Sequence, residues 1–149
     1  MQFPSISQMI PILQTAIGPV ILISGIGLLL LTMTNRLGRV IDRARVLASG
    51  FPDIKEDGNR EKVEAQLSIL WKRAGLLRLA ITLASMSALS AAILIIALFF
   101  SALWKVDSAW FIGILFIACM LCLIGSLAAF IHDLNQSLAA LKLELDWGK

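Results

Sequence analysis

The chain has 149 residues, of which 58% are hydrophobic and only 15% charged, and its mean hydropathy is +0.86. A soluble domain usually carries about 25% charged residues, so the composition excludes an ordinary soluble protein. The formal net charge of +3 is explained by basic residues that flank the apolar segments, and we expect no binding to nucleic acid.

Three runs without charged residues divide the sequence: 1–35, 79–104 and 108–131. Each exceeds the ~20 residues that an α-helix needs to cross a bilayer. The first run lacks the basic start and the short apolar core of a cleaved signal peptide. We therefore predict a single membrane domain over residues 1–149, with spans at about 12–34, 79–104 and 108–131.

The first span contains two prolines. Pro11 suits the first turn of a helix, where its missing N–H has no partner to lose. Pro19 lies inside the span and frees the carbonyl of Thr15, which predicts a kinked but continuous helix. The next turn signals begin at Ser49, so this helix is expected to leave the membrane and continue to about that residue.

The second helix is predicted to begin near Asn59 or Arg60, after the Gly-, Pro- and Asp-rich stretch 49–59. Its apolar residues repeat at steps of four and three, which is the pattern of a heptad seam. The seam is Val63, Leu67, Leu70, Ala74, Leu77, Ile81, Ala84, Ala88, Ala91, Ile95 and Leu98. One uninterrupted helix of about forty residues follows from this repeat.

The third span is followed by leucines with the same steps, namely Leu134, Leu138, Leu141 and Leu145. We predict an all-α membrane protein whose three transmembrane helices extend into a cytoplasmic three-helix stalk. The stalk consists of a helical hairpin, 35–78, and a C-terminal helix, 132–149. On the first helix, the apolar stripe expected to face the stalk interior is Leu37, Ile41, Ala44 and Ala48.

The distribution of basic residues predicts the orientation, because Lys and Arg accumulate on the cytoplasmic side. Between the second and third spans the only basic residue is Lys105. Those between the first two spans include Arg36, Arg39, Arg43, Arg45, Arg60, Lys62, Lys72, Arg73 and Arg78. The N-terminus is therefore expected outside and the C-terminus inside, in the cell inner (plasma) membrane.

A basic cluster, NRLGRVIDRAR at 35–45, directly follows the first span. Residues three, four and seven apart share a helix face, so Asp42 can pair with Arg39 and Arg45. The cluster has several interpretations: a topological flank, a tie between stalk helices, a binding site for anionic lipid, the inner mouth of a pore, or catalysis. Its candidate residues are Arg36, Arg39, Asp42, Arg43 and Arg45.

The block TAIGPVILISGIGLLLLTMTNRLGRVIDRAR resembles the start of the bacterial membrane proteins grouped as domain-of-unknown-function family 2721. The residues that carry the resemblance are Ala16, Pro19, Asn35, Arg36, Leu37, Arg39, Asp42, Arg43 and Arg45. The resemblance implies a three-span layout with a basic segment between the first two spans, and it implies no activity.

A stripe of small and polar residues follows one face of the first span toward the basic cluster. It consists of Gln14, Gly18, Ile21, Gly25, Leu28 and Thr32. In a homo-oligomer, this stripe could line a pore with apolar constrictions and a basic mouth; it could equally be a helix-packing face. We expect an oligomeric, channel-like protein that passively conducts a small ion, or alternatively a non-conducting scaffold whose stalk or basic collar binds a protein partner or anionic lipid.

No motif indicates an enzyme, a metal site or a cofactor. Cys119 and Cys122 form a C-x-x-C inside the third span, where a second ligand pair for zinc is lacking, and small apolar packing is the simpler interpretation. His132 and Asp133 are interpreted as a polar pair at the membrane interface. The spans contain no Asp, Glu, Lys or Arg, which argues against ion-coupled transport.

Overall fold

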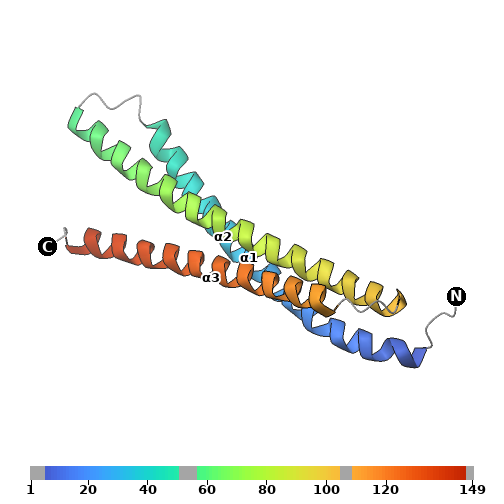
Figure 1. Cartoon of the computed structure of the whole chain (residues 1–149). Helices are drawn as coiled ribbons and strands as arrows, with labels where there is room; N and C mark the ends of the chain where they lie inside the picture. The colour runs from blue at the N-terminus through green and yellow to red at the C-terminus, as the bar shows by residue number, and fades with distance from the viewer. Residues whose placement is uncertain (1–5, 51–56, 105–108, 147–149) are drawn as a thin grey trace. The chain divides into compact units, whose positions relative to one another are not determined.

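The computed structural model describes residues 6–50, 57–104 and 109–146, which form three long helices (Figure 1). They are α1 (Ile6–Ser49), α2 (Asp57–Trp104) and α3 (Ala109–Asp146). No strand occurs within these ranges. All three helices are long and apolar enough to cross a membrane. The prediction of an all-helical membrane protein with three spans is confirmed, and the chain has the build of a multi-pass membrane protein.

α1 and α2 begin earlier than the sequence predicts. α1 starts at Ile6 and runs without interruption through Pro11 and Pro19, so Pro11 lies inside the helix and the first-turn assignment is wrong. Proline leaves the carbonyl four residues earlier without its helical hydrogen bond. Such a bond can be lost while apolar side chains and the remaining bonds hold the helix together. α2 starts at Asp57, within the few residues by which helix boundaries commonly vary.

Contacts between the helices divide the chain into two compact units, and each unit contains parts of all three helices. Unit 1 consists of Met1–Leu30 and Leu83–Gly125, and unit 2 of Leu31–Thr82 and Ser126–Lys149. The single membrane domain stays a prediction for the chain as a whole.

The core of unit 1 is built from small residues. Its buried members are Ala16, Ile26, Ala84, Ser87, Ala91, Leu94 and Cys119. The Ser87 hydroxyl lies 2.9 Å from the carbonyl oxygen of Cys119, to which it donates a hydrogen bond. Alanine and serine at a helix interface let backbones approach closely, which is the usual way that helices pack in a membrane.

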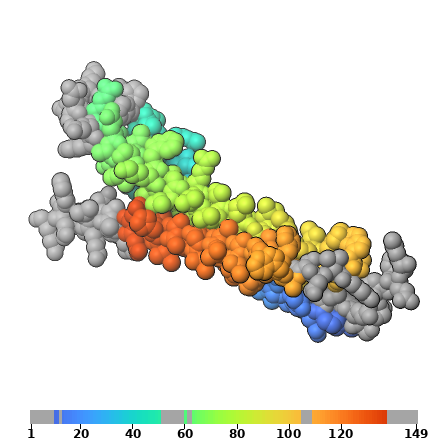
Figure 2. Space-filling model, in the orientation of Figure 1, coloured from blue at the N-terminus to red at the C-terminus, as the bar shows by residue number. Residues whose placement is uncertain are grey.

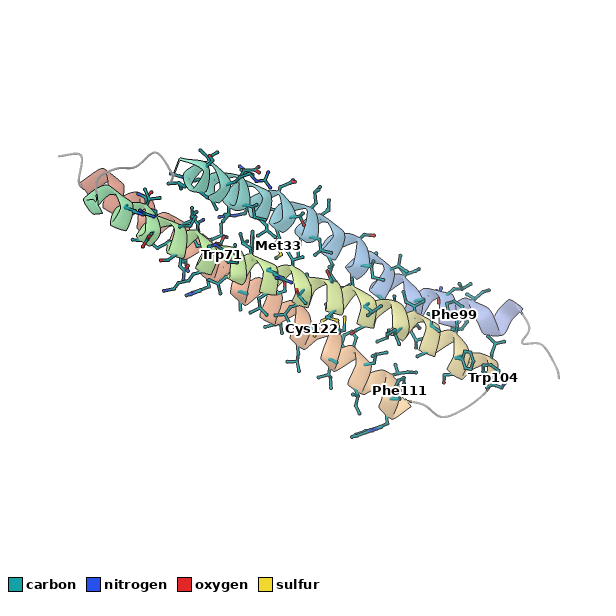
Figure 3. The ribbon with its side chains drawn as sticks, turned by 90° about the horizontal axis from the view of Figure 1, so that it is seen from above. Met33, Trp71, Phe99, Trp104, Phe111 and Cys122 are labelled. Atoms are coloured by element: carbon teal, nitrogen blue, oxygen red, sulfur yellow. The ribbon has the colours of Figure 1, made fainter. Side chains whose placement is uncertain are left out.

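The core of unit 2 centres on Val40, Leu70 and Leu77, which are all buried. Half-buried side chains pack around them: Leu37, Ala44, Leu47, Ala74 and Phe130. Met33, which Figure 3 labels, is fully buried. Ser126 on α3 lies against its sulfur. The stripe predicted for α1 is therefore correct at Leu37 and Ala44 but wrong at Ile41 and Ala48, which are exposed.

The buried face of α1 explains this shift of register. Ile26, Met33 and Val40 are buried and spaced by seven residues. The buried face therefore contains Val40, and the predicted stripe placed it one residue later, at Ile41. On α2 the predicted seam is confirmed, because all of its residues from Val63 to Leu98 are buried or half-buried. The leucines from Leu138 onward lie outside the described side chains.

A ladder of polar contacts joins α2 and α3, whose side chains pack against each other (Figure 2). In unit 1 the rung is Ser87 with Cys119, 32 residues apart in sequence. In unit 2, Ser126 donates to the carbonyl oxygen of Ala80 at 2.7 Å, 46 residues apart, and Arg73 pairs with Asp133, 60 residues apart. The two rungs of unit 2 are seven residues apart on each helix and step in opposite directions, as expected of antiparallel helices.

Candidate functional site

Asp133 on α3 is the only buried acid among the described residues. It forms the polar contact with Arg73 on α2. Its side chain has no exposed surface. An Arg73 nitrogen, Nε, lies 3.5 Å from Oδ1, and Nη2 of Arg36 lies 3.3 Å from Oδ2. Oδ2 accepts no hydrogen bond of good geometry, so the contact between Arg36 and this carboxylate is an ion pair without a hydrogen bond. Arginines from two helices thus meet one carboxylate from the third.

Both arginines have a second contact that fixes the guanidinium group. Arg73 donates from Nη2 to the hydroxyl of Ser137 at 2.8 Å. The Arg36 guanidinium carbon lies 5.5 Å from the centre of the Phe130 ring, which is within the range of a cation–π interaction. An arginine has five N–H donors, so each guanidinium keeps donors that these contacts do not use. Fixed donors with spare capacity suit an anionic ligand.

These arginines line a groove of about 480 Å³ in unit 2, which we call the arginine groove. Its walls are formed by Thr32, Arg36, Arg39, Val40, Arg43, Leu70, Arg73 and Ser137. Arg39 and Arg43 are exposed, whereas Arg36 and Arg73 are half-buried. Four arginines therefore line the groove, and two of them, Arg36 and Arg73, share the carboxylate of Asp133. The resulting excess of three positive charges favours a ligand with several negative charges.

The structure assembles part of the predicted basic cluster. Arg36, Arg39 and Arg43 line the arginine groove together with Thr32, which belongs to the predicted stripe. Arg45 is exposed and does not line it.

The predicted acid of the cluster, Asp42, is not the acid that the arginines use. Asp42 is exposed, and among the described residues it forms no ion pair with Arg39 or Arg45. The partner is Asp133, which arrives from another helix. A contact between helices brings two side chains together across a packed interface, which spacing along one helix cannot predict.

His132 and Asp133 do not act as a pair. His132 is exposed and contacts Gln136 through a ring nitrogen at 3.0 Å, whereas Asp133 is buried. Neighbouring residues on a helix point about 100° apart, so one faces out when the other faces in. The sequence does contain a signal for this burial. Cys119, Ser126 and Asp133 are spaced by seven, as are Arg73, Ala80 and Ser87 on α2.

The predicted pore-lining stripe on α1 is exposed at all six positions. Ile21 and Leu28 are 66% and 70% exposed. A Cβ atom added at Gly18 or Gly25 would meet no atom within 4 Å. Packing within one copy of the chain therefore does not require glycine at either position.

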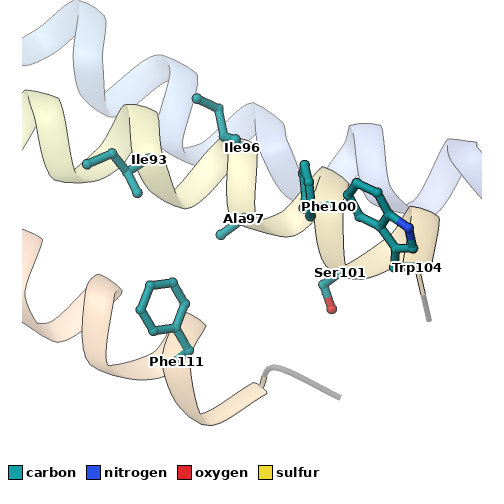
Figure 4. A pocket seen from close by; sticks show the side chains of 7 residues that line it. All are labelled: Ile93, Ile96, Ala97, Phe100, Ser101, Trp104 and Phe111. Carbon is teal, nitrogen blue, oxygen red and sulfur yellow. The ribbon is translucent and has the colours of Figure 1, made fainter. Parts of the chain in front are cut away.

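Apolar hollows also lie elsewhere among the described residues. In unit 1, a pocket of about 380 Å³ is formed by α2 and the start of α3; its lining includes Phe100, Trp104 and Phe111 (Figure 4). In unit 2, a groove of about 390 Å³ between α1 and α2 is lined mainly by aliphatic side chains and by Trp71, which is 72% exposed.

Both cysteines are free thiols in the part of the chain that is described. Cys119 is buried against Ser87, and Cys122 is half-buried with a free thiol. No group of three His, Cys, Asp or Glu side chains comes together there to hold a metal ion.

Comparison with known proteins places the chain in a family. The model of a family described as "Protein of unknown function (DUF2721)" matches residues 16–143. The chain belongs to this family. The matched region contains every residue of the arginine groove, from Thr32 to Ser137, together with Asp133. No curated protein and no solved structure matches the chain, so the family assignment supplies no activity.

Proposed function

We propose that the protein is an inner-membrane scaffold whose arginine groove binds the headgroup of an anionic lipid. The proposed role is binding and not catalysis. The observation that carries it is the buried carboxylate of Asp133, which holds the guanidinium groups of Arg36 and Arg73 in the wall of the groove. Ordered arginines recognise phosphate better than mobile ones, because less side-chain entropy is lost when the ligand binds.

The position of the groove along the helices supports a lipid ligand over a soluble one. Thr32 lies in the uncharged first run of the sequence, and Arg36, Arg39 and Arg43 follow directly after it. A lipid whose acyl chains lie beside Thr32 would present its phosphate at the level of Arg36. Near a membrane surface, each basic residue contributes about 1 kcal/mol of attraction to anionic lipid.

The proposed orientation places the groove on the cytoplasmic side, with the N-terminus outside and the C-terminus inside. It rests on the excess of basic residues between the first two spans over the single Lys105 in the second connection. The cytoplasmic leaflet carries the negative surface potential that such a groove would meet. The parts of the three helices beyond the spans form the proposed cytoplasmic stalk.

Retention of lipid by the purified protein tests this proposal. Native mass spectrometry of protein from micelles that contain equal phosphatidylglycerol and phosphatidylcholine should show bound phosphatidylglycerol. The variant Arg39→Gln/Arg43→Gln should lose it, because these exposed arginines bind ligand without supporting the core. Arg45→Gln is the matched control and should retain it. Equal retention of both lipids by the wild-type protein would refute the proposal.

A homo-oligomeric channel for a small ion is the second candidate, and one observation favours it. The stripe from Gln14 to Thr32 is exposed throughout, with open space at Gly18 and Gly25. Several copies that turned this stripe to a common axis would form a narrow pore with constrictions at Ile21 and Leu28. In planar bilayers under a KCl gradient, Ile21→Ser and Leu28→Ser should then alter the conductance. If folded oligomers carry no current, the channel is refuted and the scaffold is the function that we propose.

A further inference from the structure

On the premise that the arginine groove binds an anionic lipid, we propose that its preferred ligand is a lipid diphosphate, in which two linked phosphates follow one another away from the membrane. This inference deepens the proposed function by naming the headgroup. It rests on how the positive charge of the groove is distributed along α1.

The arginines of α1 form a row along the helix axis. Arg36, Arg39 and Arg43 share one face and one groove, and seven residues of α-helix rise by about 10 Å. The row begins one turn beyond Thr32, which lies in the uncharged first run. A helix that crosses a membrane stands within a few tens of degrees of the membrane normal. The row therefore extends away from the bilayer rather than along its surface.

The excess charge is unequal along this row. At the level nearest the membrane, Arg36 and Arg73 share the carboxylate of Asp133, which leaves an excess of one positive charge. Farther along, Arg39 and Arg43 are exposed and have no acid paired with them among the described residues. One phosphate beside Arg36 and Arg73, followed by a second beside Arg39 and Arg43, matches this distribution.

Other anionic lipids match it less well. A phosphodiester lipid carries one negative charge, which would offset only one of the three excess positive charges of the groove. A lipid with two phosphates side by side would place both at the level where Asp133 has already neutralised one arginine. A terminal phosphate carries about −1.5 to −2 charges near neutral pH, and it can accept hydrogen bonds from both distal guanidinium groups.

A matched pair of ligands tests the inference. Farnesyl diphosphate and farnesyl phosphate share one tail and differ by one phosphate, and calorimetric titration into the full chain in neutral micelles measures their dissociation constants. Farnesyl diphosphate should bind about tenfold more tightly, the difference expected from added charged hydrogen bonds. Arg43→Gln should abolish this preference while binding of farnesyl phosphate is kept. Arg45→Gln, on the same helix but outside the groove, should leave the preference unchanged.

Each other outcome is decisive. Equal affinity for the two farnesyl ligands, or equal effects of Arg43→Gln and Arg45→Gln, would overturn the inference while retained phosphatidylglycerol keeps the proposed function. Inorganic diphosphate that binds as tightly as farnesyl diphosphate would identify a site for a soluble anion and overturn the assignment to a lipid. Loss of selectivity for phosphatidylglycerol, together with no binding of either farnesyl ligand, would refute the inference and the proposed function together.

Discussion

Replacement of Asp133 by asparagine should destabilise unit 2, because this change removes the one negative charge that the described residues place against Arg36 and Arg73. Loss of one partner from a buried ion pair typically costs about 3–5 kcal/mol. The cost should be lower here, because the side chains of Arg36 and Arg73 are 25% and 18% exposed and can turn toward water. The contacts of 3.3 and 3.5 Å are also long for charged hydrogen bonds. We expect a loss of about 2 kcal/mol in the free energy of unfolding.

Reversible unfolding of the purified protein in mixed micelles measures this loss when the helix content is followed by circular dichroism during titration with sodium dodecyl sulfate. Asp42→Asn is the matched control, since Asp42 is exposed and unpaired among the described residues and should change stability by less than about 0.5 kcal/mol. The double variant Arg36→Gln/Asp133→Asn should be less destabilised than the sum of the two single variants. If Asp133→Asn unfolds at the same detergent fraction as Asp42→Asn, the ion pairs do not support the packing and the reasoning fails.

Three further predictions concern the packing and the orientation. Ser126→Ala should cost about 1 kcal/mol in the same unfolding assay, because it removes the hydrogen bond to the Ala80 carbonyl; no loss would show that this rung is energetically neutral. Gly25→Ala should leave the stability of a single copy unchanged or raised, since its Cβ would meet open space, and a dissociated oligomer in light scattering would then identify a contact between copies. Cysteine introduced at Glu64 should react with an impermeant maleimide only from the cytoplasmic side, and cysteine at Trp110 only from outside; the reverse labelling would invert the proposed topology.

The helices were predictable because their signals are local and repeated. The order of residues alone reveals the uncharged runs, which as helices are long enough to cross a bilayer. It also reveals the apolar heptad repeat from Val63 to Leu98. The start of α1 was less predictable, because Pro11 is compatible with both a first turn and a helix interior when neighbouring carbonyls can lose a bond. The stripe on α1 was misplaced by one residue because Ile41 and Val40 are equally apolar, and only the position of the other helices decides which is buried.

The arginine groove was half predictable. Its α1 wall follows from spacing, since Arg36, Arg39 and Arg43 recur on one helix face. Its other wall depends on how α2 and α3 meet, and no property of Arg73 or Asp133 in isolation distinguishes them from other charged residues near a membrane. The seven-residue spacing of Cys119, Ser126 and Asp133 is the overlooked signal, because polar residues at heptad positions mark a buried polar line.

The polar contacts between α2 and α3 also bear on the proposed function. Serine and arginine at interface positions stabilise packing only when their partners lie opposite, so they specify one register between α2 and α3 and disfavour others. In unit 2, that register places Asp133 opposite Arg73 and within reach of Arg36. A shift of one helical turn would move the carboxylate by about 5.4 Å and leave both guanidinium groups unfixed. The contacts that hold these helices in register are therefore also the contacts that order the arginine groove, and changes at Ser126 should weaken ligand binding as well as stability.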